Sequence, residues 1–436
     1  MAHRISAQPF RPQATGFAKA AASRQLDEMI AAASTQPRSH RAEGTEPLLT
    51  PVEGDRLRTS LAAAPKGVTG EVVQLAAGFF GEAAPVASAL LLRAAAARAD
   101  QLKGAGAARS LDTLRVFAGT MRGLDAATLR DRATVLDLDS GKNDSHFDAQ
   151  LLWNRRGTVH PPRPDTASDN DGLLQRFTAA CGPTVLQMLI AEADPVLAFS
   201  INQEGRASPS TQDGAAQFQR AVLEEFGGIA IPRLESHFAS RLKNGLGRLV
   251  AAGEIASSQR DALVRHATGR GPLDSQAKTA LVTLRERYDG FPTKDELQTL
   301  KTALLPARDE GLGTTEFQRA LEKYATALTG LGYRQTQPPE GFGRGQAKKY
   351  LDEVEKALTR GADVPFGLAE PAHWMLLTAT RRVSGAREFL VSDPDGGRTA
   401  WVKEKDLVSG TFGDRTFHLS LSGERPYIDC FFLPKN

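Results

Sequence analysis

The feature that most constrains the fold is the run of residues 181–193, CGPTVLQMLIAEA, which is apolar on nearly every side. A helix that is apolar all round has to be buried, so this run predicts a central core helix. Pro183 suits its first turn, where no backbone N–H partner is lost. Asp194 precedes Pro195 and predicts the end of the helix, because a residue before proline avoids the α region. The apolar side chains are Val185, Leu186, Met188, Leu189 and Ile190.

Cys181 opens this predicted helix, which makes it a candidate nucleophile. A thiol attacks as its thiolate, and a helix N-terminus favours the thiolate through unpaired N–H groups and a partial positive charge. Gln175 stands six positions before Cys181. The Gln175 amide and the Cys181 backbone N–H are together suited to hold the oxyanion of an acyl-transfer intermediate.

Three blocks of sequence resemble the papain-like cysteine peptidases. They are Cys-Gly-Pro-Thr at 181–184, Ala-His-Trp-Met-Leu-Leu at 372–377 and Val-Ser-Asp-Pro-Asp-Gly at 391–396, in the order that the family has. The Cys-Gly-Pro-Thr motif is most similar to that of the bacterial branch of the family, whose members trim bacteriocin leader peptides after a double glycine. The blocks cover a small part of the chain, and the stretch between the cysteine and histidine blocks is longer than compact members have.

The resemblance implies a catalytic triad. Cys181 would be the nucleophile, His373 the group that takes and returns the proton, and Asp393 the group that fixes the histidine tautomer, with Gln175 as oxyanion donor. Asp395 is the rival for the role of Asp393, which is favoured because it stands where a strand ends. No cofactor is expected.

Trp374 and Trp401 have two interpretations. They would shield the His–Asp pair from water, or they would simply pack in the core.

The sequence after residue 362 has the two-residue periodicity of strands. A hairpin turn is predicted at Ser384-Gly385, which brings His373 and Asp393 together if a bulge or a longer loop corrects the register. We therefore expect an α+β fold with a papain-like core, in which a helix packs on an antiparallel sheet. The predicted strands are 364–368, 373–379, 388–392, 399–402, 412–421 and 427–433, and the last of them is expected to close the sheet.

The chain divides into three predicted regions. Residues 1–60 are expected to be disordered, because periodic apolar positions are lacking. Residues 61–150 form a helical N-terminal region, with its clearest periodicity over 66–136. Residues 151–436 form the catalytic domain, which is interrupted at about 200–340 by a helical insertion. That insertion is interpreted as a substrate platform, a lid or a purely stabilising element.

Two shorter stretches have their own interpretations. Residues 137–144 carry carboxylates at the density of a calcium loop, but the glycine spacing is wrong, and a solvated turn is favoured. The proline-rich residues 158–171 are interpreted as a linker.

Composition narrows the function class. A formal net charge of +3 over 436 residues gives no indication of nucleic-acid binding. Two cysteines are too few for a disulfide framework and favour synthesis in a reducing cytoplasm. The absence of an apolar run of 18 residues predicts no membrane span. No histidine has metal-site spacing, and no HExxH, P-loop, GxSxG or CxxC motif occurs.

The acid-poor N-terminal segment is interpreted as plain disorder, as an export signal of the injected-effector kind or as a transit peptide. It lacks the apolar stretch of an ordinary secretory signal. The abundance of alanine, arginine, glycine and leucine is typical of a bacterial protein.

Three functions are compatible with these features. The leading hypothesis is a thiol-dependent hydrolase, a cysteine protease that cleaves peptide or isopeptide bonds in a protein or peptide substrate. The second is a glutamine deamidase or transglutaminase-like effector that uses the same triad. The third is a secreted effector or toxin whose helical region binds a target and whose core is inactive.

Overall fold

The structure is a computed structural model, and it describes residues 19–37, 47–136, 173, 180–202, 218–219, 221–227, parts of 243–283, 311–337, 344–369, 373–394, 398–412 and 427–435. The chain forms two compact units. The first comprises Met1–Thr134, Ile190–Ser200 and Thr326–Leu331. The second comprises Val135–Leu189, Ile201–Ala325 and Gly332–Asn436.

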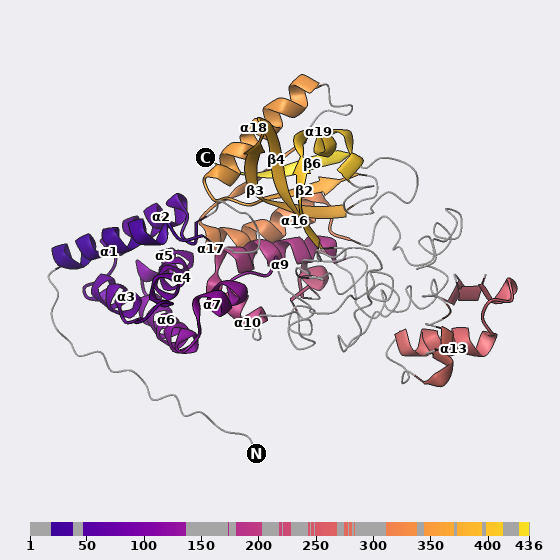
Figure 1. Cartoon of the computed structure of the whole chain (residues 1–436), viewed down its shortest axis with the longest axis horizontal. Coiled ribbons are helices and arrows are strands. Elements are labelled where there is room, and N and C mark those ends of the chain that lie inside the picture. The colour runs from indigo at the N-terminus through magenta and orange to yellow at the C-terminus, as the bar shows by residue number, and fades with distance from the viewer. Residues whose placement is uncertain are drawn as a thin grey trace, which may run out of the picture. The chain divides into compact units, whose positions relative to one another are not determined.

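The described part of the first unit is helical, as predicted for residues 66–136. Helix α4 is its centre, because its alanine- and leucine-rich sequence is buried on all sides and lets neighbouring helices approach closely. Figure 1 shows α1, α3, α6 and α7 around it. The helices are α1 (Lys19–Ala33), α2 (Pro51–Ala62), α3 (Val68–Ala77), α4 (Ala84–Ala97), α5 (Ala99–Leu102), α6 (Ala107–Met121), α7 (Ala126–Arg132), α10 (Pro195–Ile201) and α17 (Thr326–Thr329).

The prediction that residues 1–60 are disordered is wrong for α1, for α2 and for residues 47–50, which precede α2. Leu26 and Ile30 of α1 and Leu57 of α2 are fully buried in the core of the first unit. Thr50 begins α2 through a capping box with Glu53. Ala22, Leu26, Ile30 and Ala33 recur at helical spacing and are all buried, so α1 has an apolar face that the prediction overlooked.

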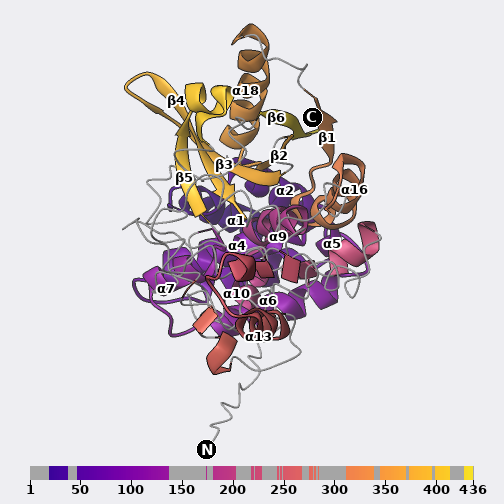
Figure 2. The ribbon, with the colours of Figure 1, turned by 90° about the vertical axis from the view of Figure 1, so that its right-hand side faces the viewer.

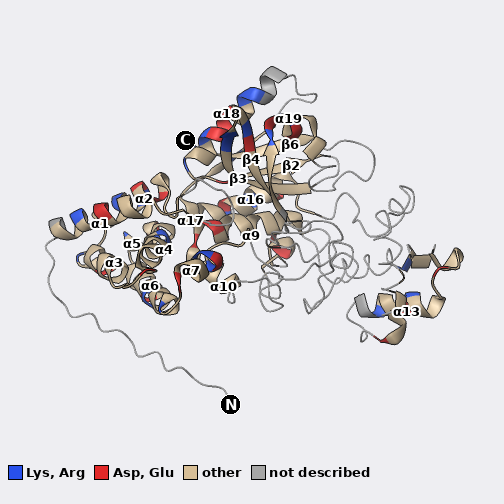
Figure 3. Cartoon of the chain, in the orientation of Figure 1, with Lys and Arg blue, Asp and Glu red and all other residues tan. Residues whose placement is uncertain are grey.

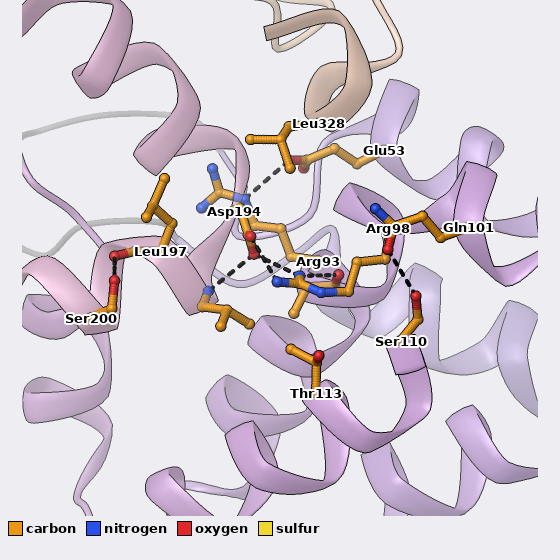
Figure 4. A network of polar contacts seen from close by, with 12 residues as sticks. Glu53, Arg93, Arg98, Gln101, Ser110, Thr113, Asp194, Leu197, Ser200 and Leu328 are labelled. Carbon is orange, nitrogen blue, oxygen red and sulfur yellow. Dashed lines mark hydrogen bonds and ion pairs between the residues drawn. The ribbon is translucent and has the colours of Figure 1, made fainter. Parts of the chain in front are cut away.

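Polar side chains also join the parts of the first unit. Arg98 donates two hydrogen bonds to the Asp194 carboxylate, at 2.8 and 2.9 Å. Arg93 is buried in α4 and donates to Glu53 at 3.0 Å (Figure 4). The Arg56 guanidinium of α2 hydrogen-bonds the Leu328 carbonyl and so caps the end of α17.

The second unit contains a six-stranded sheet in the order β1-β6-β2-β3-β4-β5, and every neighbouring pair is antiparallel. The predicted α+β class is therefore confirmed at this level. The strands are β1 (Tyr333–Thr336), β2 (Val364–Leu368), β3 (His373–Val383), β4 (Ala386–Asp393), β5 (Arg398–Lys403) and β6 (Ile428–Pro434). The helices are α9 (Cys181–Ala193), α13 (Ser257–Ala267), α16 (Thr314–Ala320) with a π-helical turn over Leu321–Ala325, α18 (Arg344–Thr359) and α19 (Glu404–Ser409).

The local strand predictions agree with β2, β3, β4 and β5. The β3–β4 hairpin turns at Ser384 and Gly385, whose φ angles are 50° and 82°. Two successive positive φ angles are what a two-residue hairpin turn of matching twist requires. The expected register shift is present as an irregularity between Leu377 and Ala379.

Three features differ from the predictions. Strand β1 falls inside the region read as a helical insertion, and it pairs with β6 at the edge of the sheet. Strand β6 lies between β1 and β2, so it does not close the sheet. Phe412 is helical rather than the start of a strand.

Helices cover both faces of the sheet in the second unit. Figure 1 shows α18 along one face and α16 on the other, and Figure 2 shows the same arrangement from the side. Charged residues are frequent along α18 and at the hairpin end of β3 and β4, whereas α9 has almost none (Figure 3). Arg387 is buried there between Asp352, Glu355 and Glu404; burial opposes its charge, but the three carboxylates raise its pKa overall.

Several predictions fall outside the residues that the structure describes. They are the carboxylate-rich stretch 137–144, the linker 158–171 and residues 413–421 of the predicted strand. Among the described helices, none has both the length and the apolar character that a membrane crossing requires.

Candidate active site

His373 and Asp393 form a buried pair at one end of the β3–β4 hairpin. His373 is the first residue of β3 and Asp393 the last residue of β4. The His373 Nε2 atom lies 2.6 Å from Asp393 Oδ1. The side chains are 8% and 1% exposed, so water hardly competes for this hydrogen bond.

Cys181 also belongs to this cluster. Interaction with its thiol contributes to raising the pKa of His373, so the thiol lies near the imidazole. Since Nε2 is engaged by Asp393, Nδ1 is the ring nitrogen that is left for the thiol.

The start of α9 fixes the position of Cys181. The Ala180 carbonyl accepts from the Thr184 backbone N–H at 2.8 Å and from Thr184 Oγ1 at 2.7 Å. Ala180 is thus the N-cap position and Cys181 the first helical residue. The backbone N–H groups of a first turn have no acceptor within the helix, so they point out as hydrogen-bond donors.

The surroundings raise the pKa of His373 well above its ordinary value. Burial opposes the charged ring, but the negative charge of Asp393 and its hydrogen bond favour it more strongly, and Cys181 acts in the same direction. A histidine held protonated beside a thiol stabilises the thiolate by charge attraction.

The remaining predicted site residues have different outcomes. Gln175 and the rival acid Asp395 lie outside the residues that the structure describes. Trp401 packs beneath the Arg381 guanidinium, 4.2 Å from the ring centre, which favours the packing interpretation for this residue.

Trp374 contacts residues that the sequence analysis did not connect with the site. Its indole N–H donates to the Leu312 carbonyl at 2.8 Å, and its ring stacks on Phe317 at 4.3 Å. Gly182 also lies against it. No local signal in the sequence connects Leu312 or Phe317 with a strand that comes much later in the chain.

Cys430 provides a contrast to Cys181. It is buried in β6, where burial and the neighbouring Asp429 raise the pKa of its thiol to about 12. This environment is that of an inert core cysteine.

The arrangement brings a thiol, an imidazole and a carboxylate together in one buried cluster. Among the described residues, no group of three or more His, Cys, Asp or Glu side chains is placed to hold a metal ion. Comparisons with protein-family models, with curated proteins and with solved structures give no significant match.

Proposed function

We propose that the protein is a thiol-dependent hydrolase of papain-like fold that cleaves peptide or isopeptide bonds. The observation that carries the proposal is the buried His373 ring, whose Nε2 lies 2.6 Å from Asp393 Oδ1 and whose pKa is raised by both Asp393 and Cys181. A ring with a thiol on one side and a buried carboxylate on the other is the arrangement that nucleophilic catalysis uses.

The first half of the reaction forms a thioester. The Cys181 thiolate attacks the carbonyl carbon, a C–S bond forms, and the carbonyl π electrons move to oxygen. The backbone N–H of Cys181, at the start of α9, is a suitable donor to this oxyanion. As the intermediate collapses, the C–N bond breaks and protonated His373 gives its proton to the leaving amine.

The second half regenerates the enzyme. His373, now neutral, takes a proton from water while the water oxygen attacks the thioester carbonyl carbon. The C–S bond then breaks, a carboxylic acid leaves, and the thiolate again faces a protonated imidazole. Asp393 keeps the ring oriented and stabilises its charged form throughout.

A thiol-reactive probe tests the site directly. We expect iodoacetamide to modify Cys181 at pH 6, where an ordinary thiol is almost wholly protonated. Modification should fall in His373→Asn, and Cys430 serves as the internal reference for a buried thiol. Equal modification of both cysteines, or of neither, would favour the inactive-core hypothesis.

The bond that is broken can be identified by mass spectrometry. A candidate proteome is incubated with the wild type and with Cys181→Ala, and the peptides are compared. New peptide ends that depend on Cys181 support hydrolysis. Conversion of glutamine to glutamate without new ends would instead support the deamidase hypothesis, in which ammonia is the leaving group.

A further inference from the structure

The Trp374 indole occupies the space between the helix that carries Cys181 and the strands of the sheet. At one edge, a Cβ atom on Gly182 would lie 3.2 Å from Trp374 Cδ1. At the opposite edge, a Cβ atom on Gly367 of β2 would lie 3.1 Å from Cζ3. Both edges of the ring are therefore packed against glycine backbone, with no side chain between.

Three further contacts prevent the ring from turning or sliding. The indole N–H is held by the Leu312 carbonyl at 2.8 Å. Phe317 stacks on the ring with an interplanar angle of 16°, and Phe432 lies 5.6 Å from it between ring centres. With only 7% of Trp374 exposed, the ring has little freedom to adopt another rotamer.

The two residues in contact, Trp374 and Gly182, are each adjacent in sequence to a member of the reacting pair. Trp374 follows His373, and Gly182 follows Cys181. Any change in the distance between the ring edge and the Gly182 backbone therefore moves Cys181 relative to His373. Leu312 contributes to the same contact, since its Cβ atom would lie 3.3 Å from a Cβ on Gly182.

We propose that Trp374 is a positioning residue, and that its indole, packed directly on Gly182, sets the separation between the Cys181 thiol and the His373 ring. This inference rests on the proposed function, because it assigns the spacing of that same pair. The segment around Leu312 and Phe317 then supports the site, because both residues hold the Trp374 ring in place.

Gly182→Ala is the sharpest test, because it inserts one methyl group into this contact. The matched control is Gly119→Ala in α6, where an added Cβ meets nothing within 4 Å. The measurement is the rate of iodoacetamide modification of the Cys181 peptide from pH 5 to 9, followed by mass spectrometry. Far-ultraviolet circular dichroism and the unfolding midpoint report whether each variant is folded.

We expect Gly182→Ala to lower the rate at pH 6 by about 3- to 10-fold, because a misplacement of about 1 Å can cost ~10²-fold and one methyl group requires a smaller shift. The rate near pH 9 should stay unchanged, since any accessible thiol is then largely ionised. Trp374→Phe, which leaves a smaller ring without the N–H donor, should also lower the rate at pH 6. A merely structural role would reduce stability without changing the shape of the pH profile.

The outcomes separate the two proposals. If Gly182→Ala and Trp374→Phe are folded and both have the profile of Gly119→Ala, the positioning role is refuted while the proposed function stands. If the wild type itself reacts only as an ordinary thiol, with an inflection near 8.5, both proposals fail. If Gly182→Ala does not fold, the Trp374→Phe profile alone decides.

Discussion

Replacement of Asp194 by asparagine should destabilise the first unit far more than the same replacement at Asp100. Both carboxylates bind an arginine side chain, at 2.8 Å for Asp194 with Arg98 and 2.9 Å for Asp100 with Arg56. They differ in exposure, since the Asp194 side chain is 5% exposed and that of Asp100 57% exposed. Asp100 is the exposed counterpart of Asp194, although it also pairs with Lys103 at 2.6 Å.

The expected magnitudes follow from the contacts. Asp194 accepts both guanidinium hydrogen bonds of Arg98 and, at 3.1 Å, the backbone N–H of Val196. Asparagine turns an amide N–H₂ toward the guanidinium and leaves a buried charge without its counter-ion, which typically costs about 3–5 kcal/mol. Asp100→Asn removes a solvent-screened pair, which is worth about 0–1 kcal/mol.

Equilibrium unfolding in urea measures both values. Far-ultraviolet circular dichroism follows the helices of both units, whereas the fluorescence of Trp374 and Trp401 reports the second unit. A change in the circular dichroism transition that fluorescence does not show therefore belongs to the first unit. The reasoning would be refuted if Asp194→Asn lost no more than about 1 kcal/mol beyond the loss in Asp100→Asn.

Three further predictions concern the site and the turns. In Cys181→Ala, which removes the coupled thiol, the raised pKa of His373 should make unfolding free energy fall as pH rises above 6.5, by up to about 1.4 kcal/mol per unit. The folded state then holds one proton more than the unfolded chain, and the added change His373→Asn should flatten this slope. Gln175→Ala should lower kcat by ~10²–10³ with KM nearly unchanged, so an unaltered kcat would remove it from the site. Gly330→Ala should cost about 2–4 kcal/mol of unfolding free energy, because its Cβ would lie 2.5 Å from the guanidinium that caps α17. Gly123→Ala, with a similar positive φ but open space, should cost about 1–2 kcal/mol in the same urea titration.

The elements that sequence reasoning recovered are those whose signals are local. The apolar run of α9 predicted a buried helix that begins at Cys181 and ends before Asp194. The dipeptide Ser384-Gly385 marked the hairpin, and the hairpin brings His373 close to Asp393. In these cases a few consecutive residues determine the conformation.

The elements that were missed depend on partners far along the chain. Strand β1 is only four residues long and is defined by its pairing with β6, about a hundred residues later in sequence. Leu312 enters the site through a carbonyl oxygen, which every residue possesses. Helix α1 is a different case, because its apolar stripe of Ala22, Leu26, Ile30 and Ala33 is local but consists half of alanine, which is a weak hydrophobic signal.

The order in which the chain is synthesised bears on how the first unit folds. That unit is assembled from three separated stretches, and the last of them, Thr326–Leu331, leaves the ribosome long after Thr134. Before then, Arg98 has no Asp194 to bind and Arg56 has no α17 carbonyl to cap. The apolar core of the unit nevertheless comes almost wholly from its first stretch, with Phe199 added from the second, and α17 buries no side chain. The N-terminal helices can therefore pack as soon as they are made, and the later stretches add polar contacts to a core that already exists.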